Sequence, residues 1–106
     1  MAVSIAKASV YLDELLSCIE NIYWEANDIP SKDVCFNLIR LLQSELTELN
    51  KVSVQDHHYD YEIIAYPPTT VIEAVEALQS HLKNMVLRTQ TRVQVMPLLE
   101  NRNDYF

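Results

Sequence analysis

Two apolar stripes run through residues 4–50, SIAKASVYLDELLSCIENIYWEANDIPSKDVCFNLIRLLQSELTELN, and they decide the fold. In the first half, apolar residues recur at alternating spacings of three and four, which places them on one helix face: Ile5, Ala8, Leu12, Leu15, Ile19, Ile22 and Ala26. The second half repeats this pattern with Cys35, Leu38, Ile39, Leu42, Leu46 and Leu49. We predict helices over about 4–26 and 31–50, joined by a short connection into an antiparallel hairpin.

The residues around the connection supply the predicted helix ends. Because the chain has no glycine, Asn27 and Asn50 are the best residues to adopt the left-handed conformation that ends many helices. Pro30 opposes continuation of the first helix. Ser31 is then the predicted cap of the second helix.

Residues 51–68 follow a different pattern. Apolar and polar residues alternate at 52–54 and again at 59–63, a period of two that is typical of β-strands. No Asn-Gly or Asp-Gly turn joins the two runs. Two alternatives therefore stay open for 52–66: short β structure, or an extended tyrosine-rich segment packed over the helices.

A third helix is predicted over about residues 70–95. Thr70 and Glu73 match a capping box, in which each side chain satisfies the other's backbone amide. Pro97 is expected to stop this helix, leaving residues 97–106 as a tail. The predicted fold class is mainly all-α: a small helical bundle built on the hairpin plus the third helix, in a single domain over 1–106.

The composition excludes several classes of binding site. The 106 residues are 49% hydrophobic and 22% charged, ordinary values for a folded domain. Glycine is absent, which removes phosphate-cradling P-loops, the dinucleotide-binding turn, the nucleophile elbow and the standard calcium loop. Side-chain surfaces are the expected working parts, and no cofactor is predicted.

The charge is negative overall and uneven along the chain. The net charge of −7 opposes nucleic acid or an anionic membrane as the main partner and favours a basic protein. Residues 1–76 hold 13 acids and 4 bases, whereas residues 77–106 hold 2 acids and 4 bases. This asymmetry could guide the docking of a partner or of a second copy.

The two cysteines and the hydropathy bear on the compartment. Cys18 and Cys35 lie within the helical patterns, so we expect buried, reduced thiols. No apolar run reaches the length of a membrane span, and no signal peptide is recognised. We therefore expect a cytoplasmic protein.

The three histidines are candidate site residues. His57 and His58 lie among carboxylates, but neighbouring side chains of an extended chain point to opposite faces, which disfavours one metal site. A polar surface loop is the preferred interpretation, with a metal site or a pH-sensitive contact as alternatives. His81 lies beside the apolar stripe of the third helix and is predicted to be part-buried or in an interface.

Two glutamate pairs are spaced three residues apart on predicted helices, Glu45 with Glu48 and Glu73 with Glu76. They resemble the paired motifs of MazG-like nucleotide pyrophosphohydrolases, although the second pair ends in Glu76 where that family has aspartate. The resemblance implies an all-α, magnesium-dependent hydrolase. Helical geometry instead favours a solvated face, because Glu73 and Glu76 fall opposite the apolar stripe, and Glu45 and Glu48 fall towards or on the polar side of the second helix.

Aromatic and basic side chains are the predicted partner-binding residues, because tyrosine, tryptophan and arginine are favoured at interfaces. The candidates are Trp24, Tyr59, Tyr61, His81, Arg88, Arg92, Tyr105 and Phe106. Local packing beneath residues 59–66 is the alternative for Trp24. A small bundle with an open side also predicts a homodimer.

The function expected from these patterns is a non-enzymatic protein-interaction module: an acidic adaptor, chaperone-like partner or regulator. One alternative is an acidic inhibitor or immunity-type protein that neutralises a basic partner such as a nuclease. The other is the magnesium-dependent nucleotide pyrophosphohydrolase implied by the four glutamates.

Overall fold

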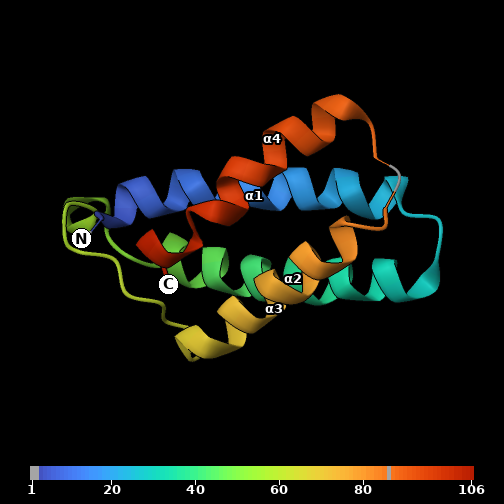
Figure 1. The fold of residues 1–106 in the computed structure, drawn as a ribbon. Helices are drawn as coiled ribbons and strands as arrows, with labels where there is room; N and C mark the ends of the chain where they lie inside the picture. Colours follow the sequence, from blue (N-terminus) through green and yellow to red (C-terminus); the bar gives the residue numbers. More distant parts are fainter. Residues whose placement is uncertain (1–2, 86) are drawn as a thin grey trace.

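The computed structural model describes residues 3–85 and 87–106, and it is all-α (Figure 1). Its elements are α1 Ile5–Glu25, α2 Ile29–Asn50, the 3-10 turn η1 Val54–Asp56, α3 Pro68–Leu82, α4 Thr89–Glu100 and the 3-10 turn η2 Arg102–Asp104. Helices α1 and α2 lie side by side as the predicted antiparallel hairpin, α3 packs on α2, and α4 packs on α1. The bundle is elongated, with extents of 43 × 22 × 20 Å.

The core lies between the predicted stripes of the hairpin. Leu12, Leu15 and Ile19 are fully buried in α1, and Leu38 and Leu42 face them from α2. The periodicity therefore gave the correct face of α1. In α2 it gave most of the buried face, but the predicted Ile39 and Leu46 are half-buried and Leu41 is buried instead. Helices α3 and α4 add buried residues to the same cluster: Val71, Ala74, Val75, Leu78, Leu82, Val95 and Leu99.

The predicted helix ends between α1 and α2 are wrong in detail. Asp28, not Ser31, caps α2, because its carboxylate accepts the Ser31 amide at 3.2 Å. Pro30 lies inside the first turn, where its missing N–H costs no helical hydrogen bond. No described residue has positive φ, so neither Asn27 nor Asn50 forms a left-handed cap. The chain instead leaves α1 through Ala26 in an extended conformation.

The connection after α2 contains no strand among the described residues, and the extended alternative holds. The amide of Ile5 donates to the Tyr59 carbonyl at 2.9 Å, and the Tyr61 amide donates to the Val3 carbonyl at 2.7 Å. These bonds flank one isolated antiparallel bridge between Ser4 and Asp60. The connection is thus tied to the start of α1 without forming a sheet.

The single third helix predicted over 70–95 is wrong: the structure has α3 and α4 there, separated by residues 83–88. The Arg92 guanidinium donates to the carbonyls of Leu82 and Met85 at the end of α3, with nitrogen–oxygen distances of 2.8 to 3.2 Å. The Glu25 carboxylate accepts the Arg88 amide and the Thr91 hydroxyl at the start of α4. These bonds satisfy carbonyls at and after the end of α3 and an amide before the first turn of α4, which have no partner within a helix.

The predicted beginning and end of that helix also need correction. Helix α3 begins at Pro68, with no side-chain cap, so Thr70 and Glu73 form no capping box. Helix α4 continues through Pro97 to Glu100. Proline in a helix interior loses one backbone hydrogen bond, but burial of Leu99 holds the following turn against the core.

The predicted tail is ordered on the core. The Tyr105 ring stacks on Tyr11, with centroids 3.7 Å apart and an interplanar angle of 3°. The Tyr11 hydroxyl donates to the Leu98 carbonyl at 2.6 Å. Phe106 meets the edge of the same Tyr11 ring. The two aromatic residues that sequence placed in a tail are therefore part of the packing between α1 and the C-terminal segment.

Within the described residues, no helix has the length and apolarity that crossing a bilayer requires.

Candidate functional site

The structure divides the predicted partner-binding residues between the two ends of the bundle. Trp24, His81 and Arg88 lie on or beside helix ends near the α1–α2 turn. The tyrosines of the connection and the last two residues lie at the opposite end, where both termini are found (Figure 1). They do not form one surface, so the two groups are separate candidate sites.

The most exposed aromatic side chain is Trp24, which keeps 77% of its surface accessible. It does not pack beneath residues 59–66. Its ring meets Tyr23 edge to face at 5.3 Å between centroids. The Lys32 ammonium lies 4.4 Å from the Tyr23 centroid and 5.9 Å from the Trp24 centroid, and it donates to the Tyr23 carbonyl at 2.7 Å. These cation–π contacts hold the exposed ring against α2.

Two more exposed apolar side chains extend this surface along α2. Ile29 is 73% exposed and Phe36 is 58% exposed. They lie three residues before and four residues after Lys32, which puts all three on one side of the helix. We call Trp24, Ile29, Lys32 and Phe36 the Trp24 face. Single exposed apolar residues are common, but such clusters mark interaction sites.

Carboxylates surround the Trp24 face. Glu20 lies one helical turn before Trp24, and Asp33 lies one turn from both Ile29 and Phe36. Both are exposed, as is Asp28. The Ser31 hydroxyl and amide lower the pKa of Asp28 below its usual range. The surface therefore presents apolar side chains inside a border of negative charge.

The structure reveals a buried carboxylate that sequence reasoning placed towards the polar side of its helix. Glu45 is 1% exposed. Its oxygens accept the Tyr61 hydroxyl at 2.6 Å, the Ile64 amide at 3.0 and 3.1 Å, and the Ala65 amide at 2.8 Å. Burial, then the hydrogen bond to Glu45, raises the pKa of Tyr61. Glu45 lies three residues after Leu42 and four before Leu49, both buried, so helical spacing could have placed it on the buried face of α2. The sequence does not signal the hydrogen-bond donors in residues 61–65 that satisfy the carboxylate there.

The four glutamates of the predicted magnesium site are not gathered. Glu45 is fully engaged with backbone and tyrosine donors, and Glu48 pairs with Lys51 at 3.2 Å. Glu73 and Glu76 are exposed on α3. Among the described residues, no group of three or more histidine, cysteine, aspartate or glutamate side chains is placed to hold a metal ion. His57 and His58 therefore form no such group with their neighbours. Nε2 of His57 instead lies at hydrogen-bond distance, 3.2 Å, from the Val52 carbonyl.

His81 is half-buried at the end of α3, as expected, and its Nδ1 lies 3.4 Å from the Ser31 hydroxyl. That hydroxyl also lies 3.1 Å from the Asp28 carboxylate. The order is Asp–Ser–His, so the carboxylate contacts the serine and does not orient the imidazole. A nucleophilic serine needs the imidazole between the other two groups. The cluster therefore serves as a capping contact between α2 and α3.

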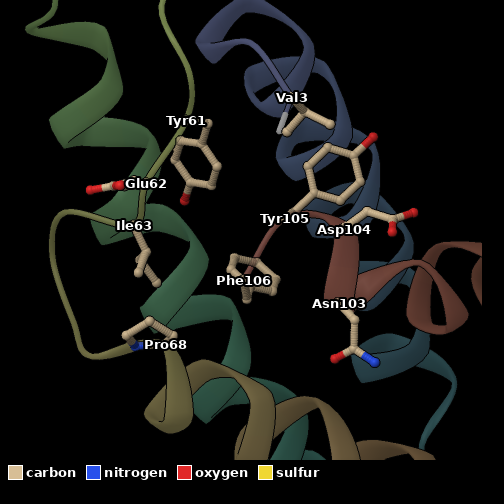
Figure 2. A pocket seen from close by; sticks show the side chains of 9 residues that line it. All are labelled: Val3, Tyr61, Glu62, Ile63, Pro68, Asn103, Asp104, Tyr105 and Phe106. Atoms are coloured by element: carbon tan, nitrogen blue, oxygen red, sulfur yellow. The ribbon is translucent and has the colours of Figure 1, made fainter. Parts of the chain in front are cut away.

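The other end of the bundle carries an open pocket of about 480 Å³ (Figure 2). It lies between the extended residues 61–63 and the C-terminal residues 103–106. Tyr61, predicted as an interface residue, is only 7% exposed and is committed to Glu45. Tyr59 is exposed and packs on His58. Among the described residues, no ion pair lies in this pocket, and the exposed Trp24 face is the stronger candidate site.

The remaining candidate residues are the two cysteines and two of the arginines. Cys18 and Cys35 are free and buried, as predicted. Burial raises the pKa of Cys35 to about 11 and also raises that of Cys18. Arg92 serves the end of α3, whereas the side chain of Arg88 is exposed.

Comparison of the chain with protein-family models, with curated proteins and with solved structures gives no match.

Proposed function

We propose that this protein is a non-enzymatic interaction module that binds a basic, amphipathic segment of a partner protein through the Trp24 face. The single observation that supports this most is the exposed cluster of Trp24, Ile29 and Phe36. These three side chains expose on the order of 400 Å², about half of what one partner contributes to a standard protein interface.

The border of the Trp24 face supports a basic partner. Glu20, Asp28 and Asp33 carry negative charge next to the apolar side chains, and the whole chain has a net charge of −7. A helix with apolar residues on one side and lysine or arginine beside them would meet both features. Trp24 is the expected centre of the interface, since tryptophan often contributes most to binding.

A second copy of the chain is the competing occupant, in line with the predicted homodimer. Two copies would bring the same carboxylates together around one apolar contact, and like charges oppose such pairing. Light scattering at micromolar concentration tests this. A dimer that Trp24→Ala converts to a monomer would contradict the basic partner.

The proposal is tested by quantitative affinity capture with three versions of the protein: wild type, Trp24→Ala and Tyr59→Ala. Tyr59 is an exposed aromatic beside the start of α1, where its carbonyl accepts the Ile5 amide, and it serves as the matched control. We expect a partner that is retained by wild type and the control, and lost with Trp24→Ala. A partner set that is identical for all three proteins would overturn the proposal.

The identified partner then allows a direct measurement. Trp24 is the only tryptophan in the chain, so its fluorescence reports on this face alone. A synthetic peptide with the partner's basic amphipathic segment should shift the emission to shorter wavelength, and should bind more weakly at high salt. If the captured partner carries no such segment, or the peptide leaves the emission unchanged, the assignment to a basic segment is wrong.

The inhibitor or immunity-type function is a narrower form of the same proposal. It is distinguished by rate: association with a basic enzyme should be fast and should slow by about 10-fold or more as salt rises. The partner enzyme should also lose activity in the complex. Binding without inhibition favours the adaptor or regulator.

A further inference from the structure

A second surface differs from the Trp24 face in both charge and shape. Helices α3 and α4 and the η2 turn enclose an open cleft of about 540 Å³. Its lining side chains are Glu76, Gln79, Ser80, Leu82, Lys83, Arg92, Met96 and Arg102. The sequence alone showed a basic C-terminal part. The fold brings three of its four cations, Lys83, Arg92 and Arg102, to one cleft.

Among the described residues, no carboxylate forms an ion pair with the cations of this cleft. Across residues 3–85 and 87–106, the only ion pair with nitrogen and oxygen within 4.0 Å joins Lys51 and Glu48. It lies at the C-terminal end of α2, away from the cleft. Lys83, Arg92 and Arg102 therefore have no carboxylate at ion-pair distance. Three cations and one acid, Glu76, line the cleft, so its local charge is opposite to that of the whole chain.

The two guanidinium groups are held in place by the backbone. Arg92 donates three bonds to the carbonyls of Leu82 and Met85, and Arg102 donates from Nη1 to the Leu99 carbonyl at 3.1 Å. Carbonyl oxygens position a guanidinium but leave its charge intact. The buried Nε of Arg102 has no hydrogen-bond partner. Both hydrogens of Arg92 Nη2 are taken by these carbonyls, and the buried Nε of Arg102 does not face the open cleft, so a phosphate would meet the Nη groups of Arg102. An arginine held in this way suits phosphate, which it binds through directed hydrogen bonds.

The rest of the lining suits the body of a small molecule. Gln79 and Ser80 offer donors and acceptors for hydroxyl or amide groups, Glu76 offers an acceptor, and Leu82 and Met96 offer apolar surface. The volume lies in the range of small-molecule sites. It exceeds what an inorganic phosphate ion needs.

We propose that the cleft between α3 and α4 binds a small phosphorylated organic molecule, with the phosphoryl group at Lys83 and Arg102 and the hydroxyl-bearing body along Gln79 and Ser80. This site is separate from the proposed partner-binding face, and the two proposals can fail independently.

The test is an NMR titration of the isotope-labelled full chain with three probes: inorganic phosphate, glucose 6-phosphate and adenosine monophosphate. The expected result is saturable shifts confined to the backbone amides of Gln79, Ser80 and Lys83 and to the arginine side-chain signals. At least one organic phosphate should bind about 5-fold or more tightly than inorganic phosphate, because it adds contacts along α3.

Two charge-matched variants separate a specific site from general attraction to cations. Lys83 lines the cleft and is exposed, with no hydrogen bond from its side chain among the described residues, so Lys83→Gln should keep the fold. Arg88 is an exposed cation outside the cleft lining, and Arg88→Gln makes the same change in net charge. We expect Lys83→Gln to weaken binding about 5-fold to 10-fold and Arg88→Gln to change it less than 2-fold.

Four results would overturn the proposal. The first three are equal weakening by both variants, shifts spread over the whole surface, and no saturation by either organic phosphate at 10-fold above the concentrations of ordinary metabolites, about 10 mM. Organic phosphates that bind no more tightly than inorganic phosphate would also contradict it. Because Trp24 does not line this cleft, the same titration on Trp24→Ala should give the same result, which keeps the outcome independent of the partner-binding proposal.

Discussion

Replacing the buried carboxylate of Glu45 by its neutral isostere, Glu45→Gln, should destabilise the fold far more than the same change at an exposed glutamate. Glu45 accepts the Tyr61 hydroxyl and the amides of Ile64 and Ala65, at 2.6 to 3.1 Å. A glutamine retains one oxygen acceptor, but its amide nitrogen must face at least one backbone N–H, so two donors oppose each other.

The magnitude follows from these contacts. A hydrogen bond to a charged group contributes about 1.5 to 3 kcal/mol, and a buried donor left without an acceptor costs about 1 to 3 kcal/mol. The Tyr61 hydroxyl can turn to accept a bond, and water can reach Ile64, which is half-exposed. We therefore expect a loss of about 2 kcal/mol for Glu45→Gln, which is a shift in Tm of about 8 to 15 °C for a domain of this size.

The assay is urea unfolding followed by helical circular dichroism, with Glu48→Gln as the control on the same helix. Glu48 forms an exposed pair with Lys51, and such pairs contribute less than about 1 kcal/mol. The amides of Ile64 and Ala65 should also exchange faster in Glu45→Gln. If the two variants differ by less than about 0.5 kcal/mol, the carboxylate does not hold residues 61–65 on α2.

Three further predictions concern other named contacts. The Thr91 hydroxyl and then the Arg88 amide lower the pKa of Glu25 below its ordinary 4.5, so its stabilisation is complete above that pH and is lost as the pH falls through the lowered value. The protection of the α4 amides, measured relative to the intrinsic exchange rate at each pH, should therefore fall on acidification, and should depend less on pH in Glu25→Gln. Cys35 has a pKa of about 11, so about one thiol in a thousand is ionised at pH 8, and alkylation should be slow until the protein unfolds. Rapid alkylation of the native protein would contradict its burial. Tyr11→Phe should cost about 1 kcal/mol in urea unfolding, because it removes the bond to the Leu98 carbonyl and keeps the ring; Tyr105 should stay packed, as judged from ring-current shifts.

The hairpin could be predicted from sequence because its determinants are local. Apolar spacing alone identifies the buried faces of α1 and α2, and residues such as Leu12, Ile19, Leu38 and Leu42 lie in the core as expected. The exact helix ends could not be predicted from the sequence. Asp28 and Ser31 are both good caps, and Pro30 fits either outside the helix or in its first turn. The choice depends on how the turn packs.

The split of the predicted third helix depends on contacts between distant residues. Local propensity allows a helix through 83–88, because the chain has no glycine or proline there. The break is stabilised by Glu25, which lies more than 60 positions from its partners. It is also stabilised by Arg92 of α4, which donates to carbonyls at the end of α3. Neither contact has a sequence signal of its own.

The candidate site was predicted only in part. Trp24 was predicted either to bind a partner or to pack beneath residues 59–66, and its exposure excludes the packing alternative. Phe36 follows Cys35 and turns about 100° away from the buried face, so its exposure could have been predicted as well. The position of Lys32 over Tyr23 and Trp24 could not, because it requires the path of the α1–α2 turn. The contacts of Glu45 could not be predicted either, because they require the path of residues 61–65 over α2.

The crossing of residues 57–65 over the open end of the hairpin has a consequence for how the molecule opens. One end of the α1–α2 pair is closed by the covalent turn at residues 26–28. The other end is closed by hydrogen bonds from this segment, to Val3 and Ile5 on one side and to Glu45 on the other. The hairpin therefore has no free end from which to fray. Under native conditions the first units to detach should be α3 and α4, which leaves the hairpin as the slowest-exchanging part of the chain.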